Sequence, residues 1–125
     1  MIIDIHGHLG NINQAPFWAA DAKQLEQYCQ KAGVDLLCIS SAKSIMYDAM
    51  EGNRDLDAAL KNSKHLLGYV TVSPVFPESK ADLRLLKSNP KFKGVKVHPD
   101  YHGFDMASLQ AIEYLDQIAE QVELM

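Results

Sequence analysis

Short apolar runs alternate with longer amphipathic segments along the chain, and this alternation restricts the possible folds more than any other feature. Four of the runs have the length and composition of strands, and they cover residues 2–6, 34–39, 66–72 and 92–98. Strands that alternate with helices pair in parallel, with right-handed crossovers between them. The sequence therefore predicts an α/β fold in which four consecutive β-α units form a single domain over residues 1–125.

Amphipathic helices are expected between these strands, over residues 21–32, 44–62, 78–88 and 105–121. Asp21 is placed to cap the first helix, and Gly33 is placed to end it. The second helix is expected to break near Gly52 and Asn53, because glycine weakens a helix interior. Residues 122–125 resemble the start of a fifth strand. The expected buried faces consist of Leu25, Tyr28, Cys29 and Ala32; Ala81, Leu83 and Leu86; and Leu109, Ile112, Leu115 and either Ile118 or Ala119.

Composition argues against several classes of partner. The formal net charge is −4 over 125 residues, and the lysines and arginines are scattered, so neither nucleic acid nor an anionic membrane is an expected partner. The longest apolar runs are too short to cross a bilayer, and no room for a signal peptide precedes the first strand. Cys29 and Cys38 have no Cys-x-x-Cys partner, and we expect two buried, reduced thiols in a cytoplasmic protein.

His6, Gly7 and His8 close the first apolar strand. Strand side chains alternate between faces, so the two imidazoles are expected to point the same way and could bind one divalent ion. Asp4 is expected on the same face, where it would orient one histidine or make a strand-end hydrogen bond. Ile3 and Ile5 are expected on the other face, under the helices. The alternative is a pair of surface histidines at a strand–loop junction.

Lys96 and His98 form a second polar pair, near the end of the fourth strand, and the same alternation places them on one face. In a parallel sheet they would lie at the same edge as His6 and His8, where α/β proteins bind ligands. Two structural alternatives stay open. Lys96 could extend to the strand end and pair with Asp4 or Asp100, and His98 could be a hydrogen-bonded histidine under a loop.

Three segments together resemble the N-terminal half of the amidohydrolase-related metal-dependent hydrolases, whose fold is TIM-barrel-like. They are residues 3–8, residues 68–74 and residues 94–103, in this order and at strand ends. The resemblance implies that His6 and His8 are metal ligands, usually for zinc, and that Lys96 and His98 are catalytic-site residues. In some branches a strand-four lysine is carboxylated and bridges two metals, and whether Lys96 does so stays open.

The same resemblance implies hydrolysis of C–N or C–O bonds of a small-molecule substrate, or decarboxylation of an aromatic acid. Family members complete the site with histidines from strands five and six and an aspartate from strand eight, for which this sequence shows no counterpart. A full barrel takes about 250 residues. We therefore expect a truncated, half-barrel chain that forms a homo-oligomer or is completed by a second chain.

Several side chains near the presumed active face could line a substrate pocket or simply pack in loops: Pro16, Phe17, Trp18, Tyr101 and His102. Two other functions remain open. One is a non-catalytic half-barrel fragment with residual metal binding or a role as a self-associating structural module. The other is a flavodoxin-like binding module, although that would need a phosphate-binding loop or an acidic cluster after the first strand.

Overall fold

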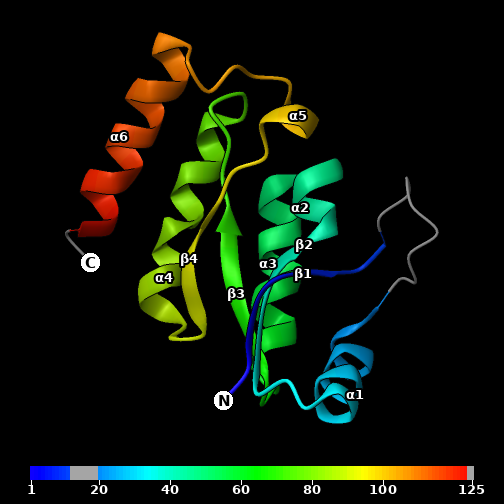
Figure 1. Ribbon diagram of the computed structural model, residues 1–125. Helices are drawn as coiled ribbons and strands as arrows, with labels where there is room; N and C mark the ends of the chain where they lie inside the picture. The colour runs from blue at the N-terminus through cyan, green and yellow to red at the C-terminus, as the bar shows by residue number, and fades with distance from the viewer. Residues whose placement is uncertain (12–19, 124–125) are drawn as a thin grey trace.

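The computed structural model of the chain describes residues 1–11 and 20–123, which contain a four-stranded parallel sheet (Figure 1). The strands lie side by side in chain order: β1 (Ile3–Leu9), β2 (Leu36–Ser41), β3 (Leu66–Thr71) and β4 (Phe92–Lys96). Helical segments follow each strand, because parallel neighbours need crossover connections. The predicted α/β class with alternating β-α units is confirmed.

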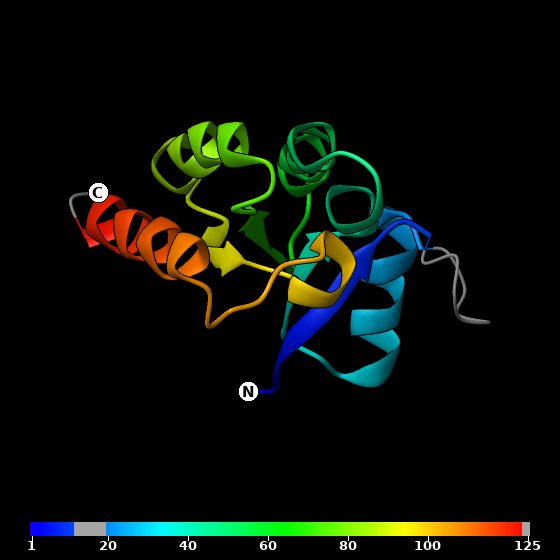
Figure 2. The ribbon, with the colours of Figure 1, turned by 90° about the horizontal axis from the view of Figure 1, so that it is seen from above.

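The helices are α1 (Ala22–Ala32), α2 (Ala42–Met46), α3 (Ala49–Leu60), α4 (Arg84–Ser88), α5 (Pro99–His102) and α6 (Leu109–Glu123), with the 3-10 helix η1 (Pro77–Leu83) before α4. Figure 2 shows the long helices arranged around one side of the sheet. The core between the two layers includes Leu37, Ile39, Val70 and Phe92 from the strands and Leu25, Leu56, Leu60, Leu83 and Ile118 from the helices. None of the helices in the described ranges has the length and apolar character needed to span a bilayer.

The other side of the sheet, which we call the open face, carries side chains that the strand register places together. His8 is level with Ser40, Tyr69 with Gly94, and Thr71 with Lys96. Because residues level with one another in a sheet point to the same side, the open face holds both His8 and Lys96.

The predicted ends of α1 are confirmed. Asp21 accepts a hydrogen bond from the Gln24 backbone N–H at 2.8 Å, and the Gln24 side chain accepts one from the Asp21 N–H at 3.0 Å. This reciprocal capping box satisfies donors that the helix leaves free. Gly33 ends the helix at φ 70°, a conformation that other residues rarely adopt. The predicted buried face is only partly right, because Tyr28 and Ala32 are exposed.

The helical stretch after β2 breaks at Tyr47 and Asp48, so the predicted break near Gly52 and Asn53 is wrong. Asp48 caps α3 by accepting a hydrogen bond from the Glu51 N–H at 2.8 Å. Gly52 lies inside α3 because α2 passes too close for a side chain. A β-carbon at position 52 would stand 2.2 Å from the Ser44 backbone nitrogen.

Asn53 is fully buried and fixes α3 to the end of β3. Its amide donates to the Thr71 carbonyl at 2.9 Å and accepts from the Thr71 N–H at 2.9 Å, as a neighbouring strand would. The same amide nitrogen lies 3.1 Å from a carboxylate oxygen of buried Asp82 in η1. Buried polar groups need such partners, and here the network binds three elements at one end of the sheet.

The predicted third helix, over residues 78–88, forms as η1 followed by α4. Leu83 is buried and Leu86 is half-buried, as predicted, but Ala81 is exposed. Leu85 is buried instead. The tighter winding of η1 changes which residues face the sheet, so a prediction based on the 3.6-residue period of an α-helix fails here.

In α6 the predicted buried stripe is only partly right. Ile118 is buried and Leu115 is half-buried against the core, as predicted, but Leu109 and Ile112 are exposed. Ala111 and Tyr114 are buried as well. Tyr114 can be buried because its hydroxyl lies 3.3 Å from the Ser79 hydroxyl. Residues 122 and 123 continue α6, so the predicted fifth strand is wrong there, and the rest of that prediction lies outside the described residues.

Candidate functional site

His6 and His8 lie on one side of β1, near its carboxyl end, as the sequence predicts. Their ring centroids are 5.0 Å apart, with the ring planes at 68°. The strand extends to Leu9, beyond its predicted end at residue 6, so both histidines are held by strand backbone. The Ser40 hydroxyl on β2 lies 3.2 Å from Nδ1 of His8. This contact orients the ring and leaves Nε2 of His8 as the nitrogen available to a ligand.

Asp4 does not share the face of the histidines, which corrects the prediction. Asp4 is level with Leu37 and Gly7 with Ile39, so β1 has one extra residue between these positions. Such a bulge reverses the alternation of side chains and turns Asp4 toward the helical face. Its carboxylate accepts a hydrogen bond from the His6 backbone N–H at 3.0 Å, not from a ring.

The bulge also changes the expected positions of the β1 isoleucines. Ile3 is level with Leu36 and therefore lies on the open face, not under the helices. Ile5, inside the bulge, is 70 % exposed. The predicted burial of both residues under helices is therefore wrong.

His8 is half-buried, and burial lowers its pKa from 6.5 to about 4, with further lowering from His6, Lys96 and His98. The ring is therefore neutral at neutral pH. Neutral imidazole is the form that binds metal ions.

His98 lies just beyond β4, at the start of α5. Its Nδ1 accepts a long hydrogen bond, 3.5 Å, from the Tyr101 backbone N–H. Burial and the positive charge of Lys96 lower the pKa of His98. Within the described ranges Lys96 has no ion pair, so the alternative pairing with Asp4 or Asp100 is not seen.

One small cavity, of about 40 Å³, joins the two halves of the candidate site. His8 from β1 and His98 from the end of β4 both line it. Ala42, Ile45 and Met46 of α2 and Tyr101 of α5 form the rest of its wall. The strand ends thus bring His8 and His98 to one cavity, although they are far apart in the sequence.

The two residues after His98 that the sequence singled out have different positions. Tyr101 lines the cavity, and its ring lies 4.8 Å from that of His98, edge to face. His102 is buried away from it. Nε2 of His102 donates to the Ile45 carbonyl at 3.1 Å, so its neutral ring carries the proton there. His102 therefore ties α5 to α2. Pro16, Phe17 and Trp18 lie outside the described residues.

The pKa values of three histidines make the stability of the metal-free protein depend on pH. Burial lowers the pKa of His8, His98 and His102 below the unfolded value of about 6.5. Below that pH the unfolded chain binds more protons than the folded chain, so the free energy of unfolding falls as the pH falls. We expect lower stability in urea at pH 5 than at pH 7.5, with chelator present. A His102→Gln variant should lose less stability than the wild type between these two pH values. Equal stability of the wild type at both pH values would contradict the prediction.

The donor set of the site fits a divalent ion only in part. His6 and His8 supply two imidazoles at one edge, whereas a catalytic zinc site has three protein ligands and an open position. In residues 1–11 and 20–123 no three histidine, cysteine, aspartate or glutamate side chains are grouped to hold an ion. A divalent ion held by His6 and His8 would need a third ligand from elsewhere.

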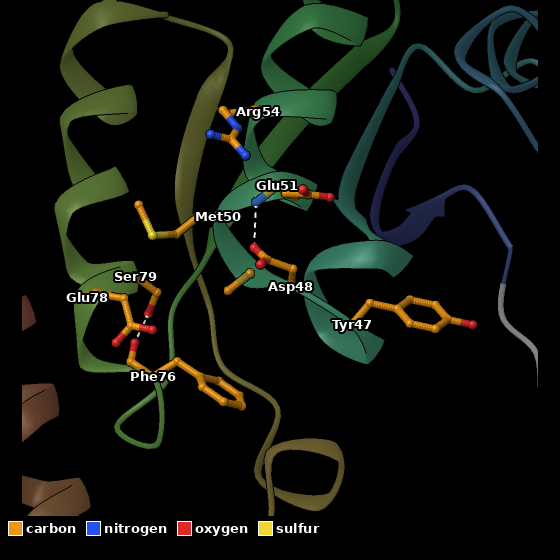
Figure 3. A pocket seen from close by; sticks show the side chains of 9 residues that line it. Tyr47, Asp48, Met50, Glu51, Arg54, Phe76, Glu78 and Ser79 are labelled. Carbon is orange, nitrogen blue, oxygen red and sulfur yellow. Dashed lines mark hydrogen bonds between the residues drawn. The ribbon is translucent and has the colours of Figure 1, made fainter.

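A larger cavity, of about 290 Å³, lies at the start of α3 (Figure 3). Its side chains already serve the fold: Asp48 caps α3, and Glu51 pairs with Lys43 at 2.9 Å. No histidine lines it. Its chemistry is therefore not that of the predicted site.

Comparison of the chain with protein-family models, with curated proteins and with solved structures finds no match.

Proposed function

We propose that this chain carries one side of the active site of a metal-dependent hydrolase, on half of a TIM-barrel-like fold of the amidohydrolase-related type. The observation that carries the proposal is the position of His6 and His8 on one side of β1, with His98 lining the same cavity as His8. Parallel α/β sheets bind ligands at the carboxyl ends of their strands, where these residues lie.

In this proposal His6 and His8 are ligands of a divalent ion, with zinc the first choice because its ligands in proteins are imidazole, thiolate and carboxylate. The Ser40 hydroxyl on Nδ1 holds the ring of His8 in place. When bound, the ion lowers the pKa of coordinated water and polarises a carbonyl oxygen.

Lys96 and His98 are the proposed substrate contacts. Lys96 brings a positive charge to the open face, and within the described ranges no carboxylate neutralises it. Nδ1 of neutral His98 accepts from the Tyr101 N–H, so Nε2 carries a proton and can donate to an oxygen. These two donors suit a small molecule with a carbonyl or carboxylate. The proposed reactions are hydrolysis of a C–N or C–O bond and decarboxylation of an aromatic acid.

Turnover of model substrates in the presence of zinc tests this function. Aryl esters, anilides and a hydroxybenzoic acid cover the proposed reaction classes, and chelator should abolish the activity. Lys96→Met and His98→Gln should each lower kcat/KM by about 100-fold. Lys87→Met, an exposed lysine on α4, is the matched control and should not change it. A zinc-loaded protein that turns over none of these substrates would favour the non-catalytic half-barrel.

A further inference from the structure

The larger cavity, of about 290 Å³, is a candidate binding site separate from the histidines. The end of α2 and the first turns of α3 form one wall of it, and residues at the start of η1 form the other. Small-molecule sites in proteins have volumes of roughly 300–1,000 Å³. This cavity therefore suits a ligand at the small end of that range.

Two charged side chains of this cavity have no ion-pair partner in the part of the chain that the structure describes. They are Arg54 on α3 and Glu78 on η1, and they do not pair with each other. The other acidic residues of the cavity have partners, since Asp48 caps α3 and Glu51 pairs with Lys43. Arg54 and Glu78 are exposed, so a ligand can reach both charges.

Apolar side chains accompany the two unpaired charges. In Figure 3 the side chain of Met50 lies between those of Arg54 and Glu78, and Phe76 lies beside Glu78. Phe76 is 44 % exposed, and its ring contacts that of buried His102 edge to face, with 5.8 Å between the centroids. His102 thus holds an exposed aromatic ring in place, and the flexible thioether of Met50 can adapt to the shape of a ligand.

We propose that this cavity binds a dipeptide with an apolar side chain by its two charged ends. The guanidinium of Arg54 binds the terminal carboxylate through two parallel hydrogen bonds, and Glu78 accepts hydrogen bonds from the terminal ammonium. The apolar side chain of the peptide packs on Met50 and Phe76. A ligand with only negative charge would be repelled by Glu78, and one with only positive charge by Arg54.

The separation of the two charges favours a dipeptide over a free amino acid. Arg54 and Glu78 do not pair, and Met50 lies between them (Figure 3). The ammonium and carboxylate of an amino acid are on one carbon atom, whereas those of an extended dipeptide are about 7 Å apart. Only the dipeptide reaches both side chains and still covers the apolar wall.

Isothermal titration with alanyl-phenylalanine tests this site, with chelator present because no metal takes part. We expect one peptide per chain with a dissociation constant of about 1 mM or lower. Arg54→Met and Glu78→Gln should each weaken binding about tenfold or more, because each removes a charged hydrogen-bonding partner. Lys87→Met on α4 and Glu120→Gln on α6 change exposed charges outside the cavity and should leave binding unchanged. Circular dichroism confirms that each variant is folded.

Blocked peptides separate the two contacts. The C-terminal amide should bind the wild type about tenfold more weakly and lose nothing further in Arg54→Met, and the N-acetyl peptide should behave in the same way with Glu78→Gln. Alanyl-glycine, which lacks the apolar side chain, should also bind about tenfold more weakly.

Three results would overturn the dipeptide site. They are no saturable binding of alanyl-phenylalanine up to about 10 mM, binding that Arg54→Met and Glu78→Gln leave unchanged, and free phenylalanine that binds as tightly as the dipeptide. None of these results bears on zinc binding by His6 and His8, so the dipeptide site and the proposed function can fail independently.

Discussion

Replacing Gly52 with alanine is expected to lower the free energy of unfolding by about 3 kcal/mol, near the upper end of the range for overpacking. A β-carbon at this position would meet the backbone of Ser44, with its nitrogen at 2.2 Å and its α-carbon at 2.5 Å. Backbone atoms cannot rotate away, so α2 or α3 must shift. Urea denaturation of the variant and the wild type measures the effect.

Ala58→Gly in the same helix is the matched control. Ala58 is exposed on α3, so glycine there should cost only about 1 kcal/mol through its low helix propensity. Helix propensity alone would make Gly52→Ala stabilising. A Gly52→Ala protein as stable as the wild type would therefore show that α2 and α3 are not packed as described.

The double variant His6→Ala/His8→Ala is expected to lose zinc affinity by at least about 100-fold, because it removes both imidazoles of the candidate site. Isothermal titration with zinc in a weakly chelating buffer measures the change. Ser40→Ala should lower the affinity by about tenfold, since it removes only the hydrogen bond that orients His8.

His65→Gln is the control for non-specific binding of zinc to histidine. His65 precedes β3, and its Nδ1 lies 2.9 Å from the Asp35 carbonyl, at the opposite end of the strands from His8. Its substitution should leave zinc affinity unchanged. If the double variant bound zinc as tightly as the wild type, the paired histidines would not be the metal site.

The order of strands and helices could be predicted from the sequence because it depends on local patterns. The capping box of Asp21 and the stop at Gly33 are signals within a few residues of the helix ends. The break between α2 and α3 could not be predicted, because Gly52 is required by a contact with Ser44. Helix propensity alone predicts a helix break at this glycine, whereas the close packing of α2 requires a glycine inside α3.

The position of the candidate site could also be predicted in part. Alternation within β1 correctly placed His6 and His8 together, and parallel pairing placed His98 near His8. The predicted face of Asp4 was wrong, because the bulge in β1 depends on its register with β2 and is not visible in the sequence of β1 alone. The contact of Ser40 with His8 and that of His102 with Ile45 depend on register and on packing between distant segments, which no local pattern shows.

X-ray absorption at the zinc edge of the zinc-loaded protein shows whether His6 and His8 bind the ion. We expect imidazole nitrogen scattering at about 2.0–2.1 Å that disappears in His6→Ala/His8→Ala. Sulfur scattering at about 2.3 Å, from Cys29 or Cys38, would contradict it, as would a spectrum that the double substitution leaves unchanged.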